Sequence, residues 1–127
     1  MAKREVISVP GRAPAPHLSP AVRVGDLVWT AGHTGRDPKT GEMPDGIEAQ
    51  TRNTLENIKA ALEAAGSSWS SVVKVNVYLS DIALRNTFNE IYFEYVPTDK
   101  PGRTAIGNVG FEGNTVVEVE CVAVVER

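Results

Sequence analysis

The sequence predicts an α+β domain in which two helices cover one face of a mixed β-sheet. Three observations support this fold class. Residues 47–65 and 84–95 repeat apolar side chains at helical spacing, whereas residues 72–79 alternate as a strand does. The other apolar stretches are short and bounded by turn residues, so the elements follow the order β-β-β-α-β-α-β-β. Two helices suffice to cover only one face of such a sheet.

The composition is that of one soluble globular domain over residues 1–127. The chain of 127 residues is 42% hydrophobic and 23% charged, and is long enough to enclose one core. Its net charge of −3 argues against nucleic acid as the main partner. No apolar run approaches the roughly 20 residues that a membrane helix needs, and no signal-peptide core follows the first residues. We therefore expect a cytoplasmic protein without a membrane partner.

The first third of the chain contains strands and an irregular arm. Residues 4–9 predict a strand that ends at Pro10-Gly11, and residues 10–20 carry four prolines. Residues 22–31 predict a hairpin with its turn at Gly25-Asp26. The second hairpin strand is apolar on both sides, so we expect both of its sides to be covered.

Two helices and a strand occupy the middle of the chain. The first helix begins at Ile47 and ends at Gly66, a residue favoured just after the last helical turn. Asp81 is expected to cap the second helix. The residues expected to face the core from the strand are Val73, Val75, Val77 and Leu79, and those from the second helix are Leu84, Phe88, Ile91, Tyr92 and Tyr95.

The last two strands, residues 103–109 and from Val116 onward, leave one sheet face without a helix. Several strands place apolar residues on both faces, and a large exposed apolar face is a liability. We therefore expect another copy of the chain to cover this face, with functional sites at subunit boundaries.

Arg103 and Glu118 are the main candidates for chemistry. A guanidinium can hold a small carboxylate through two parallel hydrogen bonds, and a carboxylate on a neighbouring strand can handle a water molecule. Taken singly, an edge-strand arginine paired with a surface carboxylate, and a solvated face formed by Glu118 and Glu120, are the more common arrangements. If a subunit covers that face, its carboxylates need a partner, for which Arg103 is suitable.

Other residues that often carry chemistry lack suitable neighbours. Cys121 is the single cysteine, so the chain has no intrachain disulfide and no cysteine-based zinc site. His17 and His33 have no second metal ligand at suitable spacing, and we expect structural or surface roles for them. Residues 32–35 lack the length and the lysine of a phosphate loop. We expect neither a metal nor a cofactor.

Stretches spread over nearly the whole chain together resemble the Rid/YjgF family of reactive-intermediate deaminases, which act on 2-imino acids and enamines. These stretches are Leu18-Ser19-Pro20-Ala21-Val22, Thr30-Ala31-Gly32, residues 37–42, residues 50–58, Ala64-Ala65-Gly66, residues 73–81, Asn89-Glu90-Ile91-Tyr92, Pro101-Gly102-Arg103 and Val117-Glu118-Val119-Glu120.

The resemblance implies a chorismate-mutase-like fold and a homotrimer with three pockets between adjacent subunits. It also implies that Arg103 binds the substrate carboxylate and that Glu118 positions or activates a water molecule. Glu118, fifteen residues after Arg103, fits the family pattern, which makes Glu120 a neighbour. The other residues that it assigns to substrate binding are Gly32, Asn89, Ala105, Leu18 and Thr104.

The implied reaction is cofactor-independent hydrolysis of a 2-imino acid, formed from an enamine such as 2-aminoacrylate, to a 2-keto acid and ammonia. Positioning and electrostatics can supply this catalysis. Leu18 stands where many members carry a tyrosine, and Ala105 where many carry a cysteine. The alternative is a trimeric module that binds a small carboxylate or has a regulatory role, or a translation-linked ribonuclease or chaperone, without deaminase turnover.

Overall fold

The computed structural model of the chain describes residues 3–127. Its elements are β1 (Arg4–Ile7), β2 (Ala21–Val24), β3 (Leu27–Thr30), α1 (Ile47–Ala64), η1 (Trp69–Ser71), β4 (Val72–Leu79), η2 (Ile82–Leu84), α2 (Arg85–Tyr95), β5 (Gly102–Ile106) and β6 (Val117–Val124). The predicted order of strands and helices is confirmed. β1 and β5 are shorter than expected, since they end at Ile7 and Ile106 instead of Val9 and Val109.

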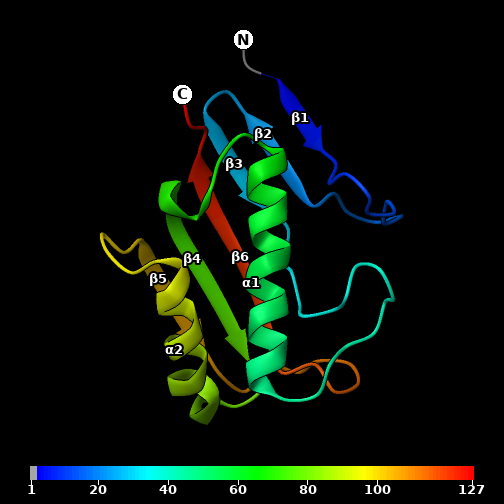
Figure 1. Ribbon diagram of the computed structural model, residues 1–127, viewed down its shortest axis with the longest axis vertical. Helices are drawn as coiled ribbons and strands as arrows, with labels where there is room; N and C mark the ends of the chain where they lie inside the picture. Colours follow the sequence, from blue (N-terminus) through cyan, green and yellow to red (C-terminus); the bar gives the residue numbers. More distant parts are fainter. Residues whose placement is uncertain (1–2) are drawn as a thin grey trace.

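The six strands form one mixed sheet in the order β1-β2-β3-β6-β4-β5. β4 and β5 are parallel, and the other neighbouring pairs are antiparallel. Figure 1 shows α1 and α2 in front of the same face of this sheet. The predicted α+β class, with two helices on one face, is therefore confirmed.

α1 buries its predicted apolar stripe between the helix and the sheet. The buried members of the stripe are Thr51, Leu55, Ile58, Ala61 and Leu62. Gly66 follows the helix with φ 84°, a left-handed conformation that glycine adopts without strain. The amides of Gly66 and Ser67 donate to the carbonyls of Glu63 and Leu62 at 3.1 and 2.8 Å. These two bonds end the helix at the predicted residue.

The predicted alternation of β4 is wrong at its first residues. The register with β6 shifts between Val72 and Lys74, so Val72 is buried whereas Val73 is 49% exposed. Beyond this shift, the apolar residues between 75 and 79 face the core as predicted. A β-bulge adds one residue to a strand without changing the residue types around it, so the alternation alone does not reveal it.

α2 begins one short turn later than predicted. Asp81 caps η2 rather than α2, because its carboxylate accepts a hydrogen bond from the Ala83 amide at 2.9 Å. α2 then packs three residues of its predicted stripe into the core, namely Phe88, Ile91 and Tyr92. β4, η2, α2 and β5 together form the parallel crossover at this end of the sheet.

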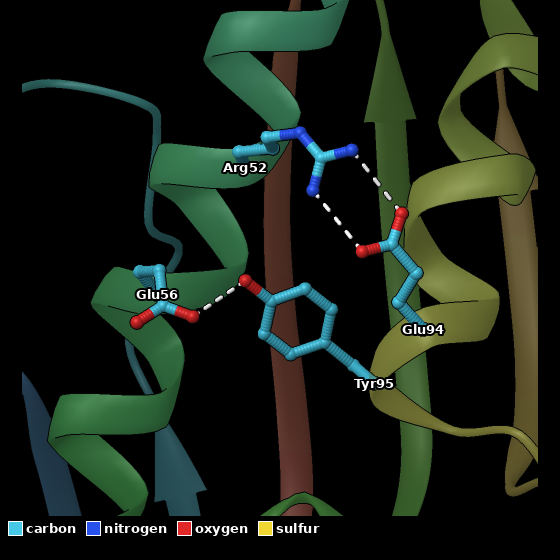
Figure 2. A network of polar contacts seen from close by, with 4 residues as sticks. All are labelled: Arg52, Glu56, Glu94 and Tyr95. Carbon is cyan, nitrogen blue, oxygen red and sulfur yellow. Dashed lines mark hydrogen bonds and ion pairs between the residues drawn. The ribbon is translucent and has the colours of Figure 1, made fainter.

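Exposed polar contacts join α1 to α2 (Figure 2). Arg52 donates to both carboxylate oxygens of Glu94 at 3.1 and 3.2 Å, and Tyr95 donates to Glu56 at 2.5 Å. Solvent screens these pairs, so the packing of the two helices depends mainly on the buried apolar contacts beneath them.

No helix of the described residues covers the opposite face of the sheet. Residues paired across neighbouring strands point to the same face, so the registers define this open face. Leu27 and Trp29 lie on it and are 40% and 43% exposed, whereas Val28 and Thr30 are buried beneath the helices. We expected both sides of β3 to be covered. Within this chain only the side that faces the helices is covered.

Candidate functional site

Arg103 lies on the helix side of β5, paired in register with the buried Val75. Its guanidinium carbon is 4.9 Å from the ring centroid of Tyr92 and 5.8 Å from that of Phe88. Its Nη1 is buried and has no hydrogen-bond partner within residues 3–127. An unpaired buried donor on a charged group is costly. Binding of an anionic group at Nη1 would remove that cost.

Two further unpartnered polar atoms come from α2. The amide oxygen of Asn89 and the hydroxyl of Tyr92 are both buried without a hydrogen-bond partner in the described chain. Their residues are three apart and therefore lie on one side of the helix. Burial raises the pKa of Tyr92, and the nearby charge of Arg103 opposes this only in part. Arg103 is thus next to a neutral phenol.

Two other residues of β5 that are expected to contact the ligand lie on opposite faces of the sheet. Ala105 is paired with Val77 and lies on the same face as Arg103. Thr104 is paired with Asn76 and lies on the open face, where its hydroxyl accepts a hydrogen bond from Lys74 at 3.0 Å. The structure therefore brings Arg103 and Ala105 to one face and Thr104 to the other.

Glu118 lies on the open face, in register with Tyr78. A Cβ built on Gly32 would be 2.2 Å from its Oε2, so the carboxylate occupies the space that glycine leaves free. Burial, and secondarily the charge of Glu120, raise the pKa of Glu118. Glu120 differs from it, because Glu120 accepts hydrogen bonds from the Tyr78 hydroxyl and from Asn76.

Arg103 and Glu118 therefore lie on opposite faces of the sheet. β4 also separates their strands, since the order is β6-β4-β5. The expectation that their strands are neighbours is wrong. Arg103 does not pair with this carboxylate within one chain, and the pairing expected when another subunit covers the open face stays a prediction. The registers Val75↔Arg103 and Tyr78↔Glu118 place the two side chains on opposite faces.

Leu18 and Gly32 lie together in the wall of a cavity of about 420 Å³, formed by the proline-rich arm and the loop after β3. This loop is held by α1, because the side-chain amide of Asn57 donates to the carbonyls of Thr34 and Arg36 at 2.9 Å each. This role of Asn57 was not among the predictions from the sequence. The feature that could have indicated this role is an amide side chain next to the apolar stripe of α1, where the structure buries it.

The remaining candidates for chemistry are structural. Burial raises the pKa of Cys121 to about 12, so its thiol is unreactive. Burial also lowers the pKa of His33, whose Nε2 lies 3.0 Å from the carbonyl oxygen of Pro20. Within residues 3–127, no group of three or more potential metal-binding side chains comes together.

Comparison with known proteins identifies the family. The sequence profile described as Endoribonuclease L-PSP matches residues 10–125. A RutC family protein of Pyrococcus abyssi is 40% identical over 124 residues, which cover 97% of this chain and 98% of that protein. The chain belongs to the YjgF/RutC/Rid family. The resemblance to the Rid/YjgF family inferred from the sequence is thereby confirmed.

A solved structure of another family member has the same fold as this chain, and the family members carry different names. A protein of Rattus norvegicus named 2-iminobutanoate/2-iminopropanoate deaminase is 36% identical, with 95% of this chain and 90% of that protein covered. The crystal structure of a putative endoribonuclease L-PSP from Entamoeba histolytica has a TM-score of 0.91 at 34% identity, covering 97% of this chain and 100% of that one. Across the described part of this Rid family chain, no helix has the length and apolar composition needed to span a membrane.

Proposed function

We propose that this chain is a cofactor-independent deaminase of small 2-imino acids. Water adds to the C=N carbon of R–C(=NH)–COO⁻, and the resulting adduct releases NH₃ to leave R–C(=O)–COO⁻. The C=N double bond is replaced by a C=O double bond whose oxygen comes from the water, and both hydrogens of the water leave in NH₃, so the reaction balances without oxidation or reduction. Membership of the Rid family, and relatives named as imine deaminases, support this reaction class.

The observation that carries the proposal is the unpaired, half-buried guanidinium of Arg103. Its Nη1 has no hydrogen-bond partner within residues 3–127, and the rings of Phe88 and Tyr92 lie against the group. A guanidinium held in this way is prepared to bind the substrate carboxylate. The unpaired amide oxygen of Asn89 can accept a hydrogen bond from the imino N–H of the substrate.

Glu118 positions and activates the attacking water in this proposal. A general base works best when its pKa lies near the operating pH, and burial moves the pKa of Glu118 in that direction. Gly32 leaves room for the carboxylate, and Leu18 supplies an apolar wall nearby.

We further propose that each site forms between two subunits. Arg103 and Glu118 face opposite sides of the sheet, so a single chain does not present both to one ligand. The apolar open face, with Leu27 and Trp29 exposed, supports self-association. A closed homotrimer with three such sites, working in the cytoplasm on a free imino acid, fits these features.

The test is hydrolysis of imino acids made in situ by an amino-acid oxidase. The purified protein is expected to release 2-keto acid and ammonia faster than the spontaneous reaction. Arg103→Ala should lower kcat/KM by roughly 100-fold, about 3 kcal/mol of transition-state binding. Arg85→Ala, at an exposed arginine of α2, is the control. Turnover equal to the spontaneous rate, or an unaffected Arg103→Ala variant, would contradict the proposal.

The second candidate is a module that binds a small carboxylate without turnover, and the same unpaired Arg103 favours it. Thermal-shift measurements with 2-ketobutyrate, pyruvate and benzoate test it. Stabilisation that depends on Arg103, with no catalysis in the oxidase assay, would support binding alone. An RNA-cleavage assay tests the activity that the family description names, against which the net charge of −3 argues.

A further inference from the structure

A cavity of about 420 Å³ lies between the proline-rich arm and the loop after β3. Residues of the segments 12–20 and 32–41 enclose it, together with Asn57 of α1. Its volume is within the range of small-molecule sites. Leu18 and Gly32 belong to its wall, but no residue of α2, β5 or β6 does. The cavity thus adjoins the proposed deaminase site without containing Arg103 or Glu118.

The wall of this cavity carries an excess of positive charge. Arg12 and Arg36 line it, and its single acidic residue, Asp37, accepts hydrogen bonds from two backbone amides of its own turn. Both ion pairs found in residues 3–127 involve other side chains. Neither arginine of the wall therefore has a carboxylate partner in the described chain.

Arg12 is held in place although its charge is not compensated. Its Nη2 donates to the Oδ1 of Asn57 at 3.3 Å, and the amide group of Asn57 is itself fixed by its bonds to two loop carbonyls. The Nε of Arg12 is buried and has no partner in the described chain. Burial lowers the pKa of this guanidinium, as expected for a cation without a counter-ion.

We propose that this cavity binds a small organic carboxylate, with Arg12 as its anchor. The guanidinium offers two parallel N–H groups to a carboxylate, and the apolar side chains of Ala15, Leu18 and Pro20 can receive a compact hydrocarbon body. This site differs from the proposed deaminase site in its anchor, because it uses neither Arg103 nor Glu118, although Leu18 and Gly32 border both sites.

The test is a titration of the full-length, ¹⁵N-labelled protein with sodium benzoate, followed by NMR. Saturable shifts are expected at the backbone amides of Thr34 and Asn57. Arg12→Gln, which removes the charge, should weaken binding about tenfold or more. Ala15→Phe, which fills the cavity and keeps Arg12, should do the same. Arg4→Gln, at an exposed arginine of β1, should leave the affinity within about twofold.

The Arg103→Ala variant separates this site from the proposed catalytic one. The shifts at Thr34 and Asn57 should persist in it, whatever its effect on turnover. The proposal is overturned if benzoate causes no shift at Thr34 and Asn57. That result is expected if a carboxylate of another subunit already occupies the cavity. It is also overturned if Arg12→Gln and Ala15→Phe bind normally, if only Arg103→Ala abolishes the shifts, or if inorganic phosphate binds as tightly as benzoate.

Discussion

The guanidinium carbon of Arg103 lies 4.9 Å from the centre of the Tyr92 ring, and the Tyr92 hydroxyl is buried without a hydrogen-bond partner in the described chain. The ring and the hydroxyl therefore have opposite effects. The ring supports the cation, a contact worth about 1 kcal/mol. The hydroxyl carries the desolvation cost of an unpaired polar group.

Substitutions of Tyr92 separate these two effects. Tyr92→Phe keeps the ring, so we expect kcat/KM within about twofold of the wild type and a free energy of unfolding unchanged or raised by up to about 1 kcal/mol. Tyr92→Leu removes the support of Arg103. It should raise KM and lower the free energy of unfolding by about 2 kcal/mol. Urea unfolding and steady-state kinetics measure both. An equal loss of kcat/KM in the two variants would show that the hydroxyl, not the ring, matters.

The pKa of Glu118 predicts how activity depends on pH. As a general base it must be ionised, so kcat/KM, corrected for spontaneous hydrolysis, should fall as the pH drops through a pKa above the ordinary value. Glu120→Gln removes the second cause of this shift. It should therefore move the acid limb of the pH profile to lower pH, whereas Glu118→Gln should abolish most of the activity. An acid limb that does not move in Glu120→Gln would contradict this role of Glu120.

The same raised pKa predicts an effect on stability. A carboxyl group whose pKa is higher in the folded state favours folding most at low pH, below its unfolded pKa. That contribution is lost as the pH rises through the folded pKa, because ionisation then opposes burial. Glu118→Gln should therefore raise the free energy of unfolding near neutral pH and lose this advantage in acid. Denaturant unfolding of both proteins at several pH values checks the sign.

Gly32→Ala tests the close approach of residue 32 to Glu118. The new Cβ would lie 2.2 Å from Oε2, so the carboxylate must move. Because Oε2 ends a flexible side chain, we expect a melting temperature close to that of the wild type but a kcat at least about tenfold lower. Gly110→Ala is the matched control, since in the described chain no atom beyond its two sequence neighbours lies within 4 Å of the position that its new Cβ would take. Full activity of Gly32→Ala would show that the exact position of Glu118 is unimportant.

Local patterns predicted the elements of this fold but not how distant strands meet. The stripe of α1 and its end at Gly66 follow from helical spacing and from the conformational freedom of glycine. The position of β4 between β5 and β6 depends on long-range pairing, which no local pattern encodes. For that reason the sequence suggested Arg103 and Glu118 as candidates but wrongly placed them on neighbouring strands.

The support of the candidate site was less predictable than the candidates themselves. Tyr92 has the spacing of a core residue, and its second role as a platform depends on which β5 residue packs against it. The role of Asn57 was equally unpredictable, because the function of a buried amide is apparent only when the carbonyls that accept its hydrogen bonds are known. Both roles follow from tertiary packing rather than from residue type.

Mixing two inactive variants tests whether a site uses two chains. Arg103→Ala and Glu118→Gln chains each lack one group, so their separate homo-oligomers should be inactive. When the two are co-expressed in equal amounts, a site between subunits can combine Arg103 of one chain with Glu118 of the next. Random assembly makes about a quarter of the sites complete, and the same fraction of wild-type activity should return.

The control for this mixing experiment is an oligomer in which both substitutions occupy one chain. Co-expression of the Arg103→Ala/Glu118→Gln double variant with wild-type chains also leaves about a quarter of the sites with both groups. The two mixtures should therefore have similar activity if sites lie between subunits. If each site used a single chain, the first mixture would be inactive and the second would keep about half of the activity. The opposite faces occupied by Arg103 and Glu118 lead us to expect the first result.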